Sequence, residues 1–297
     1  MVILEPLRLG QERQGGVFIT GNSLSLNGGS IDAAAREGSS GQAGVVDIAI
    51  ANDILIENAE ISIENNAVKS DLYSISPAAL RISAKNLFMT EGNIRSDSSG
   101  NLPAGNIILG IKDGLYLNSG SAISTEANNA DGGVINISDG KKIFIQNSAI
   151  TTSVYGQSGN GGNIAITANG LILDSGFIQA NTAASGASGG KVDIQTPALI
   201  PSGSSLFIGG NSPFQFQPFS GLNVIQAAAP DGVSGTISTV TPQLNLNAMM
   251  TNLAIEPFDS NALSRDMCEV SDSSSLLQSG RGAQPLRARD LLLSPVF

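Results

Sequence analysis

Short runs of alternating hydrophobic and polar residues recur about every 28 residues through most of this 297-residue chain. Clear copies begin at Gly105, Gly132 and Gly161, where glycine precedes a run rich in Ile and Leu. Because residues i and i+2 of a strand project to the same side, the alternation predicts strands with one buried face. One copy is too small to bury that face alone, so the copies are expected to stack on one another.

Each copy contains three such runs. In two neighbouring copies the apolar positions are Ile107, Leu109, Leu115, Leu117 and Ile123, followed by Ile135, Ile137, Ile143, Ile145 and Ile150. Three strands close one coil, or rung, and stacked rungs pair each strand in parallel with its equivalent about 4.8 Å away. The pattern therefore predicts an all-β fold: a right-handed parallel β-helix, a single-stranded solenoid with three short strands and about 28 residues per rung. A leucine-rich repeat has a similar period, but its LxxLxL…N signature and helical arc are missing.

Asparagine and aspartate recur between the second and third runs. The residues are Asn27, Asn58, Asn118, Asn147 and Asp174. Both residue types tolerate the left-handed backbone that a sharp corner needs. Two explanations fit this pattern: a ladder of side-chain amides bonded from rung to rung, or a simple preference of these residues for turns.

The repeat divides the chain into four regions. Residues 1–15 are expected to form an irregular N-terminal segment, and residues 16–200 the β-helix, with a surface loop between Ile63 and Leu80. Residues 201–255 hold a phenylalanine-rich excursion and a last rung, and residues 256–297 a polar tail expected to be mostly disordered. The excursion contains Phe207, Phe214, Phe216 and Phe219. Because an open β-helix end exposes core and strand edges, we expect the excursion to cap the stack; the alternative is a ligand-binding loop.

One outward column of the predicted second strands is apolar where a solvated face would be polar. Its members are Leu55, Phe88, Tyr116, Phe144 and Ile172, and we call this column the apolar stripe. A contiguous apolar surface of this kind is rare on a soluble monomer unless it is covered or used in contact. The stripe is therefore either covered by loops, by the excursion or by the tail, or it contacts a second β-helix, a host surface or a polysaccharide.

Composition argues against most catalytic classes. The chain has no His and one cysteine, Cys268, so it lacks a Cys/His zinc set and the usual Ser/His and Cys/His nucleophile couples. On the outward side of the first strands, Asp47 and Asp193 are five rungs apart, roughly 24 Å, which is too far for a glycosidase carboxyl pair. The GGxGxD calcium repeat is missing. We therefore expect no catalytic, cofactor or metal site.

Charge and the terminal sequence limit partners and location. The formal net charge of −10 disfavours nucleic acid as a partner. The N-terminus, MVILEPLRLG, has no basic region, and its apolar run is broken by Glu5, Pro6 and Arg8, so we expect no signal peptide on this chain. No apolar run is long enough to predict a membrane-spanning helix, and we expect a soluble chain.

The repeats and the tail together resemble a known family. The tail carries Cys268, then Ser273, Ser274 and Ser275, then Gly280, Arg281 and Gly282, followed by Pro285 and Asp290 with Leu291. With the GGxIxI…GxIxLxxSxI rungs, this resembles the carboxy-terminal region of filamentous-haemagglutinin-like exoproteins of two-partner secretion, of the cyanobacterial type. The ending here, GRGAQPLRARDLL, departs from that family's Gly-Arg-Gly-Gly-Leu-Pro-Pro motif, and the family's amino-terminal secretion domain is missing.

The resemblance implies a non-enzymatic β-helical stalk fragment of a secreted or cell-surface adhesin. It also implies an extracellular or outer-membrane location, and an outer-membrane transporter as partner of the full-length protein. Two alternatives come from other functional classes. One is a carbohydrate-active β-helix of the lyase or hydrolase kind, and the other is a purely structural presenter of an upstream domain.

Overall fold

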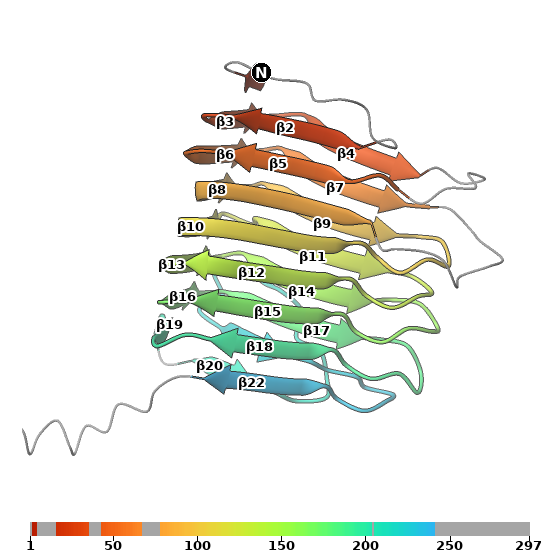
Figure 1. The fold of residues 1–297 in the computed structure, drawn as a ribbon. Coiled ribbons are helices and arrows are strands. Elements are labelled where there is room, and N and C mark those ends of the chain that lie inside the picture. Colours follow the sequence, from red (N-terminus) through yellow and green to blue (C-terminus); the bar gives the residue numbers. More distant parts are fainter. Residues whose placement is uncertain (1, 5–15, 36–42, 67–77, 204, 241–297) are drawn as a thin grey trace, which may run out of the picture. The chain divides into compact units, whose positions relative to one another are not determined.

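The computed structural model describes residues 2–4, 16–35, 43–66, 78–203 and 205–240. They belong to one compact unit, Met1–Gln243. The second unit, Leu244–Phe297, lies outside the described residues, as do the expected polar tail and residues 67–77 of the expected loop. The described residues contain no helix and stack as a parallel β-solenoid of about six turns with about 29 residues per rung (Figure 1), so the predicted fold class is confirmed.

The first and second strands of the rungs form one 14-stranded sheet. The first strands are β2 (Val17–Gly21), β5 (Val46–Ile50), β12 (Val134–Gly140), β15 (Asn163–Ala168), β18 (Lys191–Gln195) and β22 (Thr236–Val240). The second strands are β3 (Leu24–Asn27), β6 (Asp53–Glu57), β13 (Lys142–Gln146), β16 (Leu171–Asp174) and β19 (Leu199–Pro201). In two rungs the first and second strands merge into one long strand, β8 (Ala79–Thr90) and β10 (Asn106–Asn118).

The third strands form a separate eight-stranded sheet. Its strands are β4 (Ser30–Ala35), β7 (Glu60–Asn65), β9 (Asn93–Ser98), β11 (Ala122–Ala127), β14 (Ala149–Val154), β17 (Phe177–Thr182), β21 (Asn223–Gln226) and β20 (Leu206–Ile208). In Figure 1 the strands in front run to the left, those behind run to the right, and the chain descends, so the coil is right-handed. At the N-terminal end β1 (Val2–Leu4), within the segment expected to be irregular, pairs with β3 in antiparallel fashion.

Equivalent residues of successive rungs stand directly above one another. Ile107 pairs with Ile135, Ile135 with Ile164, and Ile164 with Val192. These inward columns are buried, with relative exposures of 0 or 1%. The core is thus a set of parallel stacks of Ile, Leu and Val, and each rung buries its apolar face against its two neighbours.

A column of glycines lets neighbouring rungs approach closely just before the first strands. Gly105, Gly133, Gly162, Gly190 and Gly235 occupy equivalent positions. A Cβ on any of the last four would overlap the carbonyl oxygen of the glycine one rung earlier. The repeated glycine is therefore required by close backbone contact.

The corner between the second and third strands is built on a left-handed residue in each rung. The residues in this column are Gly28, Asn58, Glu91, Ser119, Asn147, Ser175 and Gly203, with φ from 47° to 67°. Asn58 and Asn147 were predicted at this corner, and a preference for left-handed backbone accounts for both.

The other predicted corner residues, Asn27, Asn118 and Asp174, lie one position earlier. Hydrogen bonds along this earlier column join unlike side chains. Asn27 donates to Glu57 over 2.9 Å, and Gln146 donates to Asp174 over 2.9 Å. The rung-to-rung bonding at this corner is therefore a ladder of mixed polar side chains.

The glycine column makes a testable prediction about stability. We expect Gly162→Ala to lower the free energy of unfolding by about 1–3 kcal/mol or more, because the new methyl group overlaps the backbone of the previous rung. Gly110→Ala is the matched control, because no atom lies within 4 Å of its added Cβ. Thermal unfolding followed by circular dichroism measures both variants, and equal melting temperatures for the two would contradict the role of the column.

Candidate functional site

The apolar stripe is one continuous column on the outward face of the second strands. Its backbone register pairs Leu55 with Phe88, Phe88 with Tyr116, Tyr116 with Phe144, and Phe144 with Ile172. Ile200 of β19 pairs with Ile172 and extends the column by one rung. Ile200 was not predicted from the sequence, although it lies 28 residues after Ile172, at the spacing of the repeat.

Neighbouring side chains of the stripe pack on one another and remain partly open to solvent. The rings of Phe88 and Tyr116 stack with centroids 4.8 Å apart and planes 7° from parallel. The stripe ends in more exposed aliphatic residues, with Leu55 37% and Ile200 52% exposed. The half-buried aromatic residues between them present ring surface along the rungs of β8, β10 and β13.

The phenylalanine-rich segment, residues 205–222, packs elsewhere. Phe216 meets Phe177 edge-on at 5.2 Å, and Phe207 meets Phe214 at 4.6 Å. These rings pack around Ala149, Phe177 and Val224, which share one outward column of the third strands. The segment therefore covers the outward face of β14, β17 and β21.

Hydrogen bonds hold this segment in place. The Gln179 side chain donates to the Phe214 carbonyl over 2.9 Å, and the Phe219 amide donates to Asn147 over 2.7 Å. This segment was one possible cover for the apolar stripe, but it lies against a different face of the solenoid. β20 at its start also forms the last strand of the eight-stranded sheet, beyond β21.

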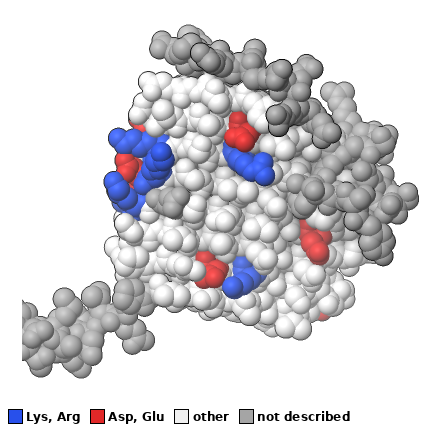
Figure 2. Space-filling model, viewed as in Figure 1, with Lys and Arg blue, Asp and Glu red and all other residues white. Residues whose placement is uncertain are grey.

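Lysines gather at the corner just before the second strands, on one side of the stripe. We call Lys85, Lys112, Lys141 and Lys142 the basic corner. In Figure 2, Lys and Arg side chains gather at the left edge of the face shown, beside the second strands. Asp113 lies among them, 2.6 Å from the Lys141 ammonium and 3.8 Å from that of Lys85. The hydrogen bond from Lys141 lowers the pKa of Asp113 below its ordinary value.

The basic corner joins the stripe directly. The ammonium of Lys142 lies 5.2 Å from the centre of the Tyr116 ring, which is a cation–π distance. Lys142 also stands in the outward column next to the stripe, where it pairs with Gly114 of the preceding rung. This group was not predicted from the sequence, although lysine recurs near the same corner of three successive copies, in SAKN, IKDG and DGKK.

A second charged group lies on the outward face of the third strands. Arg95 contacts three carboxylates: Glu60 over 3.1 Å, Glu64 over 3.3 Å and Asp97 over 3.2 Å. Glu64, Asp97 and Glu126 stand in one column on consecutive rungs. We call these five residues the Arg95 cluster. The sequence analysis examined the first strands, where Asp47 and Asp193 share a column five rungs apart, and missed this closer set.

The electrostatics of the cluster favour a protonated carboxyl group. Burial raises the pKa of Asp97 to about 6; Arg95 opposes this shift, and Glu126, Glu64 and Glu60 add to it. One buried oxygen of Asp97 has no hydrogen-bond partner among the described residues.

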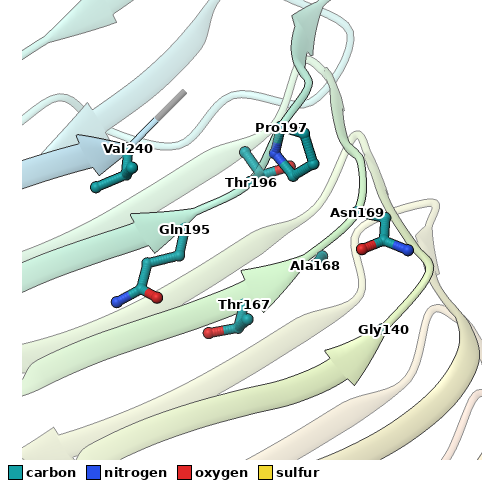
Figure 3. Close-up of a pocket in the computed structure, with 8 residues that line it drawn as sticks. All are labelled: Gly140, Thr167, Ala168, Asn169, Gln195, Thr196, Pro197 and Val240. Carbon is teal, nitrogen blue, oxygen red and sulfur yellow. The ribbon is translucent and has the colours of Figure 1, made fainter. Parts of the chain in front are cut away.

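A hollow of about 580 Å³ lies at the corner that follows the first strands of the last rungs, β12, β15, β18 and β22. Its lining residues are Gly140, Thr167, Ala168, Asn169, Gln195, Thr196, Pro197 and Val240 (Figure 3). It carries no charged side chain, and Val240 on its rim is the last described residue. We therefore assign it no function.

The fold and these surfaces define a parallel β-helical solenoid with an apolar stripe, a basic corner and an acidic cluster. Comparison with protein-family models, with curated proteins and with solved structures found no match. In the part of the chain that the structure describes, no three His, Cys, Asp or Glu side chains are placed to hold a metal ion. The same part contains no helix long and apolar enough to cross a membrane.

The raised pKa of Asp97 predicts a pH-dependent stability. The unfolded chain releases this proton near pH 4 and the folded chain near pH 6, so the group's stabilising contribution is full below pH 4 and is lost as the pH rises through 6. We expect the melting temperature of Asp97→Asn to increase relative to that of wild type as the pH rises from 4 to 7, because only wild type loses this contribution. The lowered pKa of Asp113 predicts a change at lower pH: the stability that Asp113 contributes is present above about pH 4 and is lost as the pH falls further, so Asp113→Asn is expected to lose less stability there than wild type. Parallel melting curves for wild type and Asp97→Asn across this range would contradict the assignment.

Proposed function

We propose that this chain is a non-enzymatic structural protein, a β-helical stalk that makes surface contacts through the apolar stripe. The proposal rests on the column of five apolar residues, extended by Ile200, that occupies one outward position of the second strands on consecutive rungs. Partly exposed apolar surface that is continuous over several rungs is typical of contact sites. The phenylalanine-rich segment, one of the possible covers, packs on another face.

The solenoid supports a mechanical role. Its parallel ladders run uninterrupted from β2 to β22 in one sheet and from β4 to β21 in the other. Each rung is held by backbone hydrogen bonds and by a buried apolar face on both sides. Such a stack holds a surface column straight and at fixed spacing, as a stalk or a presenter of a neighbouring domain requires.

The repeat and tail motifs support a setting for this role. On their resemblance we propose an adhesin-like exoprotein of the filamentous-haemagglutinin type, secreted or held at the cell surface. The full-length protein would leave the cell through an outer-membrane transporter. The stripe would then be the part of the stalk that meets a host surface, a polysaccharide or another β-helix.

Replacing the aromatic side chains tests the contact role. We expect Phe88→Ser with Phe144→Ser to abolish self-association or adhesion while the melting temperature stays close to that of wild type, because both rings are partly exposed. Ile108→Ser with Tyr155→Ser is the matched control, since both side chains are exposed and lie off the stripe. Sedimentation velocity and a surface adhesion assay provide the measurements. A large fall in melting temperature with unchanged binding would contradict the proposal.

The Arg95 cluster favours a second candidate, a carbohydrate-active β-helix. Glu64, Asp97 and Glu126 follow one another at about 4.8 Å per rung, so neighbouring and alternate members fall near the roughly 5 to 9.5 Å that separates the carboxyl groups of glycosidases. Asp97, with its pKa raised to about 6, would be the general acid. Glu126, which forms no ion pair with another described residue, would be its carboxylate partner.

Release of reducing ends from a panel of polysaccharides tests this candidate. Activity in the wild-type chain that falls by about 100-fold or more in Asp97→Asn and in Glu126→Gln would favour the enzyme over the stalk. Asp193→Asn is the control, since this carboxylate lies on β18 of the other sheet, where it pairs with Lys191. If wild type shows no turnover, or if all variants show the same turnover, the carbohydrate-active candidate is contradicted.

A further inference from the structure

Three neighbouring rungs combine different chemistry in adjacent outward columns. The rungs of β8, β10 and β13 carry Phe88, Tyr116 and Phe144 in the middle column. On one side lies the basic corner, with one or two lysines per rung. On the other side lie Thr90, Asn118 and Gln146, which offer a hydroxyl and two amides. On these three rungs the stripe is therefore bordered by cations along one side and by neutral hydrogen-bonding groups along the other, whereas Glu57 and Asp174 occupy the second column on the rungs before and after.

The middle column offers apolar surface to the C–H groups of a sugar. The rings of Phe88 and Tyr116 stack on one another with centroids 4.8 Å apart, so their stacked faces cover each other and the partner meets the remaining partly exposed ring surface. This surface repeats along the solenoid axis at about 4.8 Å per rung.

The bordering charge selects among polysaccharides. Among the described side chains Lys112 and Lys142 form no ion pair with a carboxylate, and Asp113 is shared between Lys85 and Lys141. The four lysines, counted with Asp113 and Asp139 of the same sequence stretches, carry a formal net charge of +2 within a chain of net charge −10. The lysines recur once or twice per rung, which matches a polymer that carries one carboxylate on each sugar unit.

We propose that the apolar stripe and the basic corner together bind a linear polyuronate, a polysaccharide built of uronic acid units, with its chain parallel to the solenoid axis. This inference rests on the proposed contact function of the stripe and names the partner. The aromatic column packs against the C–H groups of the sugars, the lysines pair with the carboxylates, and Thr90, Asn118 and Gln146 bond the sugar hydroxyls. The Arg95 cluster, on the separate sheet of the third strands, takes no part.

Isothermal titration of the full chain with oligogalacturonate tests the proposal, with neutral dextran and dextran sulfate as comparison ligands. We expect binding to oligogalacturonate that weakens as the salt concentration rises, because exposed charges are screened. Neutral dextran is expected not to bind. Equal binding of neutral dextran, or stronger binding of dextran sulfate, would overturn the assignment to a polyuronate.

Charge-removing variants locate the site. Lys112→Gln with Lys142→Gln is expected to weaken binding about tenfold, since it removes two exposed charges and the cation over Tyr116. Lys191→Gln, on the first-strand face, removes one charge of the same kind and is expected to leave binding unchanged. Equal weakening in both would mean a general charge effect and would overturn the proposed site.

The outcomes also separate this inference from the contact function on which it rests. Phe88→Ser with Phe144→Ser is expected to weaken oligogalacturonate binding at least about tenfold. If wild type binds no oligogalacturonate but the variant loses the self-association that wild type shows, the polyuronate assignment fails and the contact function stands. If the variant changes neither property, both fail.

Discussion

Everything in this protein depends on one constraint, the direct stacking of each rung on the previous one without slippage. The glycine column before the first strands enforces this spacing, because a side chain at Gly133, Gly162 or Gly190 would overlap the backbone of the neighbouring rung. Backbone ladders then keep equivalent residues paired throughout the solenoid. A shift of one residue would exchange the inward and outward columns, so the Ile and Leu core stabilises the same register that the glycines permit.

Once the register is set, each position of the repeat becomes a column, and each face acquires a uniform chemistry over several rungs. The second strands present the apolar stripe beside lysines, whereas the third strands present carboxylates around Arg95 and, further along, a surface covered by phenylalanines. The two charged groups lie on separate sheets and differ in sign. The solenoid thus carries distinct surfaces without any change in its core, since inward columns decide folding and outward columns are free to vary.

The sequence allowed the inward columns and the apolar stripe to be predicted, because both depend only on period-2 alternation and on the repeat length. The left-handed corner was predicted one position too early for Asn27, Asn118 and Asp174, since Asn and Asp suit either position and the column also accepts Glu91 and Ser175. The Arg95 cluster follows from the same alignment applied to the third strands. The place of the phenylalanine-rich segment could not be predicted from this alignment, because an irregular segment has no period. It packs where Phe177 and Val224 leave apolar surface.

The contrast between the two charged surfaces bears on function. In the Arg95 cluster a guanidinium engages three carboxylates and burial raises the pKa of Asp97, so much of the charge is neutralised within the protein. At the basic corner Asp113 pairs with Lys85 and Lys141, whereas Lys142 lies over an aromatic ring. Charge that the fold leaves uncompensated beside partly exposed aromatic surface is charge available to a partner. The second-strand face therefore meets the requirements of a binding surface more fully than any other described part of the chain.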